Sequence, residues 1–174
     1  MTSSATLLSR DELKLAGLVE HQLLKPLGEG DKKRWLFVTN ELEELLRGES
    51  DSSFPSAGAD NIIARFCKGL IVSVSRKATS VTADFKWLQD HDQAWVLILD
   101  EPRPGWRMFG RFARKNVFVG LSCLPRHDCA PWQMYQQRAT DMISDWQSRF
   151  PVEPLRSNRY NDYFSDPFWD KDAP

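Results

Sequence analysis

The sequence predicts an α+β fold with two N-terminal helices, a mostly antiparallel sheet of about four strands, and a C-terminal helix followed by an irregular tail. Three observations support this prediction. Apolar residues repeat at helical spacing before residue 50, β-forming runs dominate the middle of the chain, and a second helical stripe occupies residues 131–150. Because the helices gather at the ends of the chain and do not alternate with strands, we favour α+β over a doubly wound sheet.

Length and composition set the broad class. The 174 residues fit one domain, which we place at residues 1–151, with residues 152–174 as a tail that is docked or partly disordered. The three cysteines show no disulfide framework, the N-terminus has no signal-peptide pattern, and no apolar run reaches membrane length. We therefore expect a cytoplasmic protein without a membrane partner. The formal net charge of −1 argues against a protein that coats nucleic acid without specificity.

The first helix is predicted from about Arg10 to Lys25. Ser9 and Glu12 have the spacing of a capping box, in which each side chain accepts a hydrogen bond from the other residue's backbone amide. Leucines then recur at helical spacing, and a proline and a glycine after Lys25 are expected to end the helix.

The second helix is predicted from Lys32 to Arg47, with Asp31 as its cap. An alternative is a short strand at Trp35–Val38, because four consecutive apolar residues there include β-formers. We favour the helix because the apolar periodicity continues through Leu46.

The middle of the chain predicts loops, strands and one short helical segment. Residues Gly48–Asp60 form a loop by composition, Gly69–Ser75 is a β-run, and Arg76–Ser80 resembles a turn. Asp84–Asp90 is expected to form one or two helical turns. Ala94–Leu99 is apolar at every position, which is typical of a central strand covered on both sides.

A β-hairpin and a long helix complete the predicted domain. The hairpin strands are Trp106–Ala113 and Val117–Leu124, joined by a tight basic turn. The helix begins near Pro131, with Asp128 as a possible cap, and runs to about Phe150, where a proline follows. The tail has no periodicity, and its aromatic residues are expected to dock it on the body: Tyr160, Tyr163, Phe164, Phe168 and Trp169.

The hairpin region is also where positive charge is concentrated. The stretch Pro102–Asp128 holds six basic side chains and no carboxylate before Asp128, in a chain that is slightly acidic overall. Strand alternation places Arg107, Phe109 and Arg111 on one face and Trp106 with Phe112 on the other.

A two-residue turn, at 114–115 or 115–116, extends this alternation into the second strand. It places Phe118, Gly120 and Ser122 with the arginines. On the core face it places the side chains of Val117, Val119, Leu121 and Cys123.

Guanidinium groups that bind phosphate, interleaved with rings that stack on bases, are typical of a surface for single-stranded nucleic acid. The candidate RNA-binding residues are Arg107, Phe109, Arg111, Arg114, Lys115 and Phe118. The alternative is that a helix buries both rings and that the arginines pair with acidic residues of the first two helices.

Arg126 and His127 follow the second hairpin strand and are the candidate catalytic residues. A histidine can transfer protons at neutral pH, and an adjacent arginine can stabilise the charge that develops on phosphate during RNA cleavage. The alternative is a loop histidine that caps the next helix or faces water.

The sequence predicts no cofactor or metal site. Cys123, His127 and Cys129 include types of ligand that zinc favours, but a structural site needs a fourth ligand and Cys123 falls on the core face. There is no glycine-rich phosphate loop with the required lysine and serine.

The stretch from Ala94 to Phe150 resembles the RelE-like toxins and their phage-derived relatives. The resemblance rests on the arginine-bearing strand 106–112, the apolar strand 117–121, and the basic residues Arg126 and His127 before a helix. It implies a cytoplasmic RNA-binding protein, either a toxin-type endoribonuclease acting on ribosome-associated mRNA or an RNA binder alone, with an antitoxin-like protein partner.

A hypothesis of another class is a non-enzymatic module that binds proteins. Its basic face would dock an acidic partner segment or the chain's own tail, which carries Asp162, Asp166, Asp170 and Asp172.

Overall fold

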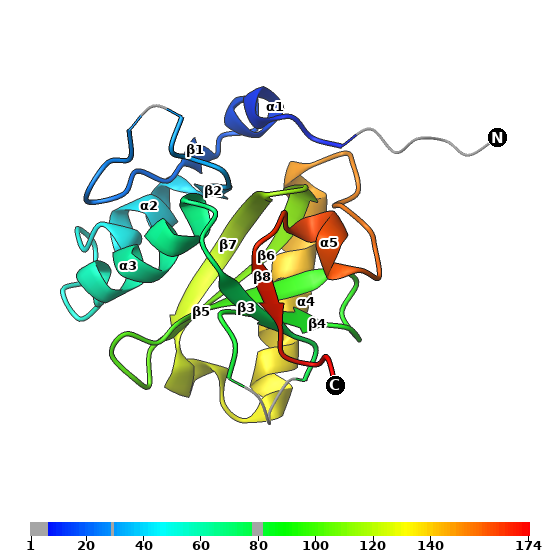
Figure 1. Ribbon diagram of the computed structural model, residues 1–174. Helices are drawn as coiled ribbons and strands as arrows, with labels where there is room; N and C mark the ends of the chain where they lie inside the picture. Colours follow the sequence, from blue (N-terminus) through cyan, green and yellow to red (C-terminus); the bar gives the residue numbers. More distant parts are fainter. Residues whose placement is uncertain (1–6, 29, 78–81) are drawn as a thin grey trace.

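The computed structural model describes residues 7–28, 30–77 and 82–174, and strands from the whole of this range form one mixed sheet (Figure 1). The order across the sheet of the described residues is β1-β2-β7-β6-β5-β4-β3-β8. The strands are β1 Val19–Glu20, β2 Trp35–Val38, β3 Val72–Ser75, β4 Phe85–Leu88, β5 Ala94–Leu99, β6 Trp106–Arg114, β7 Val117–Pro125 and β8 Phe168–Asp170.

Antiparallel pairing is confined to the centre of the sheet and one edge. Strands β4, β5, β6 and β7 are antiparallel neighbours, and β1 pairs antiparallel with β2. The pairs β2–β7, β3–β4 and β3–β8 are parallel. The predicted sheet of about four mostly antiparallel strands is therefore wrong in size and in type, although the fold is α+β.

Helices cover both faces of the sheet (Figure 1). In the described residues they are α1 Arg10–Leu15, α2 Asn40–Leu46, α3 Ser56–Cys67, α4 Trp132–Arg149 and α5 Tyr160–Tyr163, with a 3-10 turn at Arg126–Cys129. One apolar core lies between the sheet and α2, α3 and α5, and the other lies between the sheet and α1 and α4. We refer to these as the α3 face and the α4 face.

The first predicted helix is much shorter than expected. Its capping box is confirmed, since the Glu12 amide donates to the Ser9 hydroxyl and the Ser9 amide donates to the Glu12 carboxylate at 2.7 Å. The helix ends at Leu15, because Gly17 adopts a φ of 86° that leads the chain into β1.

The second predicted helix is wrong in its first half, where the alternative strand is correct. Leu36 and Val38 lie in the core of the α3 face and Phe37 in the core of the α4 face, an alternation that only a strand between two packed layers permits. The hydroxyl of Thr39 then accepts from the Leu42 amide at 3.3 Å and caps α2, so the helix begins at Asn40.

Two further predictions for the middle of the chain are wrong. The expected loop at 48–60 contains the start of α3, whose Ile62, Ile63 and Phe66 are buried. The expected helical turns at 84–90 are strand β4, in which Phe85 and Trp87 enter the α3-face core while Lys86 between them faces the other side. The expected turn at 76–80 falls largely outside the described residues.

The hairpin is confirmed, with its two-residue turn at Lys115 and Asn116, but its register contains two irregularities. One extra residue at Ala113 places Phe112 directly opposite Phe118. A bulge moves every following side chain to the other face of the sheet. Phe118 therefore joins Phe112 on the α3 face, and its predicted place beside the arginines is wrong.

The same displacement changes the rest of β7. Val117, Val119 and Leu121 lie in the core of the α4 face, and not with Phe112 as predicted. A second irregularity beside Gly110 restores the register, so that Met108 pairs with Cys123 on the α3 face as expected.

The predicted long helix is confirmed as α4, which ends at Arg149 before a proline. Its N-cap is Pro131, and no side chain caps it, so Asp128 does not have the capping role considered for it. No helix of the described residues has the length and apolar character needed to cross a membrane.

The C-terminal segment packs on the domain by two means. Tyr160, Tyr163 and Phe164 are buried in the core of the α3 face, and β8 adds a parallel strand beside β3. The buried side chain of Arg34 donates hydrogen bonds to the carbonyl oxygens of Ser165 at 2.7 Å and Pro167 at 2.9 Å.

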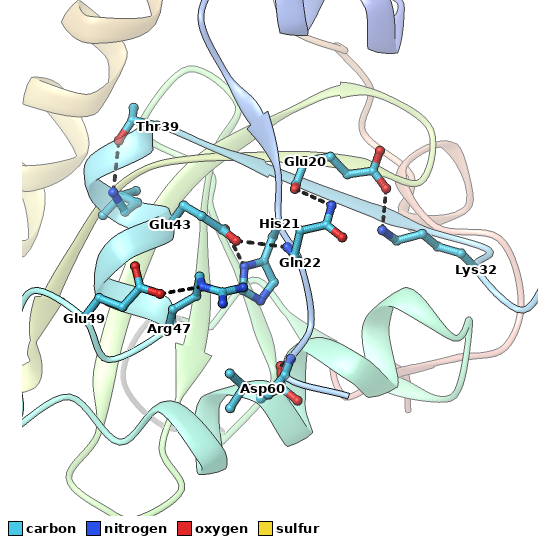
Figure 2. Close-up of polar contacts among 11 residues, drawn as sticks. Glu20, His21, Gln22, Lys32, Thr39, Glu43, Arg47, Glu49 and Asp60 are labelled. Atoms are coloured by element: carbon cyan, nitrogen blue, oxygen red, sulfur yellow. Dashed lines mark hydrogen bonds and ion pairs between the residues drawn. The ribbon is translucent and has the colours of Figure 1, made fainter. Parts of the chain in front are cut away.

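A second polar cluster ties β1 to α2 (Figure 2). His21 is 2% exposed, and its Nδ1 lies 2.7 Å from a Glu43 carboxylate oxygen. The other oxygen of Glu43 accepts from the Gln22 amide at 3.1 Å, and Lys32 pairs with Glu20 nearby. Burial raises the pKa of Glu43, but its bond to His21 and the charge of that ring outweigh this and hold it below its usual value.

Candidate functional site

Most of the predicted RNA-binding face is covered by α4. Arg107, Phe109 and Arg111 do lie on the α4 side of β6 as strand alternation requires. Phe109 is 0% exposed, and its ring packs edge-on against Tyr135 of α4 with centroids 5.1 Å apart. A base cannot stack on a ring that a helix already covers.

Arg111 belongs to the interior. It is 1% exposed, its Nη2 lies 2.9 Å from a carboxylate oxygen of Asp92, and its guanidinium lies 5.8 Å from the centroid of the Trp146 ring. Burial lowers the pKa of Arg111, and the charge of Asp92 opposes this. Arg111 therefore stabilises the packing of α4 on the sheet. The alternative left open for this face is correct in burying Arg111 beneath a helix, but its expected partner is wrong, because Asp92 lies between β4 and β5 and not in the first two helices.

The remaining candidates on the hairpin lie apart from Arg107. Arg114 and Lys115 are exposed at the turn, and a rise of about 3.3 Å per residue puts Arg114 about 23 Å along the strand from Arg107. Phe118 is fully buried on the α3 face. The structure thus divides the predicted set among four separate environments: the interior beneath α4, the α3-face core, the exposed turn, and the surroundings of Arg107.

Arg107 opens into a cavity of about 450 Å³ at the other end of the hairpin, which we call the basic cavity. Its floor is the sheet, where Lys86 of β4, Ile98 of β5 and Arg107 of β6 point to the α4 side. Ile98 and Arg107 are direct neighbours across the β5–β6 pair. The walls come from the loop that follows β5, the 3-10 turn, the start of α4 and the residues before β4.

Positive charge dominates this cavity. Lys86 and three arginines, Arg103, Arg107 and Arg126, line it together with one carboxylate, Asp100, so its formal charge is +3. We call the three the cavity arginines. Arg103 lies 3.7 Å from the Asp100 carboxylate, whereas neither of the other two forms an ion pair with any residue that the structure describes.

Burial and neighbouring positive charge act on both cations of the floor. Burial is the main cause that lowers the pKa of Lys86, and the charges of Arg107 and Arg126 lower it further. The pKa of Arg107 is also lowered chiefly by burial, with a further contribution from Arg126. An anion placed between them would relieve both the lost hydration and the repulsion.

One wall of the cavity is aromatic. The rings of Trp132 and Tyr135, on the first turn of α4, are stacked with centroids 5.4 Å apart and planes at 17°. Burial raises the pKa of Tyr135, so this phenol is neutral at physiological pH. Trp132 is 37% exposed and lines the cavity, so part of its indole is accessible to a ligand there.

The two candidate catalytic residues are placed differently. The 3-10 turn brings Arg126 into the basic cavity beside Arg107. The side chain of His127 is 76% exposed and lies 3.3 Å from the Asp128 carboxylate, and it is not among the residues that line the cavity. The structure therefore brings only one of the two to the basic cavity.

Sequence reasoning missed Lys86, Arg103, Trp132 and Tyr135 as site residues. A signal existed for Lys86, because alternation of Phe85, Lys86 and Trp87 has the period of a strand with one polar face. Tyr135 had been assigned to the apolar stripe of the predicted helix and Trp132 to its first turn, and nothing local to either residue indicates a neighbouring cavity.

The fold and the cavity together define an α+β protein with an eight-stranded mixed sheet in its described residues and a candidate site for an anionic, aromatic ligand. No protein-family model matches the chain, and neither the curated proteins nor the solved structures include a match. The comparisons thus leave the resemblance to RelE-like toxins without support.

Proposed function

We propose that this protein binds RNA through the basic cavity. The observation that carries the proposal is the presence, in one cavity of about 450 Å³, of four cations against one carboxylate together with an accessible tryptophan. Cations neutralise phosphate, and an exposed ring stacks on a base, which is the usual composition of sites for single-stranded nucleic acid.

The proposal is restricted to binding. Cleavage through a 2′-hydroxyl needs a proton acceptor close to the bound phosphate. His127 is the histidine proposed for that role from the sequence, and its exposed side chain is directed to Asp128 outside the cavity. The resemblance to RelE-like toxins adds mRNA on the ribosome as a candidate ligand and an antitoxin-like protein as a candidate partner.

The second candidate function is binding of an acidic protein segment in the same cavity. The chain's own tail is disfavoured as that segment, because two of its carboxylates are engaged elsewhere. Asp172 accepts hydrogen bonds from Ser75 at 2.7 Å and Tyr160 at 2.9 Å, and Asp162 pairs with Arg159 at 3.1 Å. An acidic segment of another protein remains as the occupant under this alternative.

Titration of a labelled single-stranded RNA, followed by fluorescence anisotropy, tests the proposal. We expect binding that weakens steeply with salt, and Arg107→Ala should weaken it roughly 10- to 100-fold because a charge-assisted hydrogen bond is lost. Arg114→Ala is the matched control, since it removes an exposed arginine from the same strand outside the cavity.

Two results would contradict RNA binding at this site. One is equal loss of affinity in the Arg107 and Arg114 variants, which would indicate attraction by surface charge alone. The other is an acidic peptide that binds the cavity while RNA fails to compete with it, which would favour the protein-binding alternative.

A further inference from the structure

The size of the basic cavity is informative about how much of a nucleic acid it holds. About 450 Å³ falls within the range of pockets that hold one small ligand. Trp132 and the two cations of the floor strands, Lys86 and Arg107, all line this one cavity. One base and one phosphate can therefore engage both features at once.

The charge of the cavity favours a phosphate at a chain end. An internal phosphodiester carries a single negative charge, whereas a phosphomonoester carries about −1.5 to −2 at pH 7. The cavity has a formal charge of +3, and its two floor cations are partly desolvated. A dianion compensates this charge better than a monoanion does.

The start of α4 adds to this preference. α4 spans 18 residues, no side chain caps its N-terminus, and Pro131 and Trp132 at that end line the cavity. The partial positive charge of a helix N-terminus, with its free amide groups, therefore acts on the same space as the cavity arginines.

We propose that the basic cavity holds one nucleotide unit bearing a terminal phosphomonoester, with its phosphate on the cavity arginines and its base against Trp132. This inference rests on the proposed function for RNA and specifies which part of the RNA is recognised. A free nucleoside monophosphate has the same chemistry, so the two sources must be separated by experiment.

The test compares three RNAs of one sequence that carry a phosphate at the 5′ end, at the 3′ end, or at neither. We expect one phosphorylated form to bind roughly 10- to 100-fold more tightly than the unphosphorylated RNA, because the extra charge forms charge-assisted hydrogen bonds. This advantage should shrink as pH falls through about 6, where the phosphomonoester loses its second charge.

The tryptophan provides an independent readout. Trp132→Ala should lower affinity for the phosphorylated RNA roughly 5- to 100-fold, as expected for loss of one stacked base, and Trp132→Phe should restore part of it. Trp169→Ala is the matched control, because Trp169 is 60% exposed and lies on β8 outside the cavity. A nucleoside monophosphate should compete better than inorganic phosphate.

The outcomes distinguish this inference from the proposed function. If all three RNAs bind equally and binding still requires Arg107, RNA binding stands and recognition of a terminal phosphate is wrong. If a nucleoside monophosphate binds and no RNA does, the nucleotide site stands and the RNA function is wrong. If inorganic phosphate competes as well as the nucleotide and Trp132→Ala has no effect, the stacking role is wrong.

Discussion

Arg107 and Arg111 lie four residues apart on the same side of β6, yet they occupy opposite kinds of environment. Arg111 is 1% exposed, paired with Asp92, and covered by α4. Arg107 lines an open cavity and forms no ion pair within the described residues. The two differ because α4 crosses the sheet over Arg111 and begins beside Arg107.

This difference teaches that strand alternation assigns a side chain to a face but not to a role. The same pattern of arginine and phenylalanine can be a packed interior under a helix or a binding site beyond its end. The position of the covering helix decides between them. Mutations at the two arginines should therefore affect different properties, stability at Arg111 and ligand affinity at Arg107.

The largest effect is expected from Arg111→Ala. This change removes a large buried side chain, together with its ion pair and its contact with Trp146, so the free energy of unfolding should fall by about 2–5 kcal/mol. Chemical denaturation measures the loss. Arg107→Ala is the control and should change stability by less than about 1 kcal/mol; equal losses would show that both arginines are structural.

The next effect concerns the salt dependence of RNA binding. Each phosphate contact releases counterions, so Arg107→Ala and Arg126→Ala should each lower the slope of log affinity against log salt by about 1. Affinity measured from low to high salt gives this slope. An unchanged slope in both variants would remove these arginines from the phosphate contacts.

The third effect is a pH dependence of anion affinity that comes from Lys86 and not from the arginines, which keep their charge. Its pKa is lowered by burial and by neighbouring charge, so Lys86 loses its proton at a lower pH than an ordinary lysine. Anion affinity is then highest below that pKa and declines as pH rises through it, by no more than about tenfold because one charge of four is lost. Lys86→Arg should abolish the decline that appears as pH is raised above 7, and a decline of equal size in that variant would exclude Lys86 as its cause.

The centre of this fold could be predicted from the sequence. The six apolar residues of β5, the hairpin with its turn, and the stripe of α4 are local patterns long enough to identify their elements. Short strands were missed where their apolar residues also fitted the spacing of a helix. Trp35–Val38 continues into a helix, so its apolar residues fitted a helical period that began too early.

The candidate site was only partly predictable, for two physical reasons. Phe118 was assigned to the wrong face because one extra residue at Ala113 shifts the register, and no residue type at that position indicates a bulge. The cavity itself is formed by segments far apart in the chain, from Lys86 to Tyr135. The order of the strands in the sheet decides which of these segments lie side by side. The spacing of residues within one segment does not predict that order.

The fourth effect concerns Asp92, the ion-pair partner of the buried Arg111, and its contribution to the stability of the fold as pH falls. Hydrogen bonding to Arg156 is the largest cause that lowers the pKa of Asp92, and Arg111 adds to it. A carboxyl with a lowered folded pKa contributes stability that is present above about pH 4 and is lost as pH falls through the folded pKa.

Denaturation at pH 7 and pH 3 measures this contribution as a difference between two proteins. Asp92→Asn should lose less stability on acidification than the natural chain, by about 1 kcal/mol or less because the Asp92 side chain is 40% exposed. The two proteins have every other carboxylate in common, so identical acid losses would show that Asp92 does not carry the effect.

The smallest effect is expected at the hairpin turn, where Arg114→Ala and Lys115→Ala remove charges that contact neither core nor cavity. Stability should change by no more than about 0.5 kcal/mol. RNA affinity at physiological salt should also stay nearly constant, because about 23 Å along the strand greatly exceeds a screening length of about 8 Å. At 0.01 M salt that length is about 30 Å, and both variants should then bind RNA more weakly. A deficit that persists at physiological salt would mean that RNA contacts the turn directly, and the binding surface would then extend along the hairpin beyond the basic cavity.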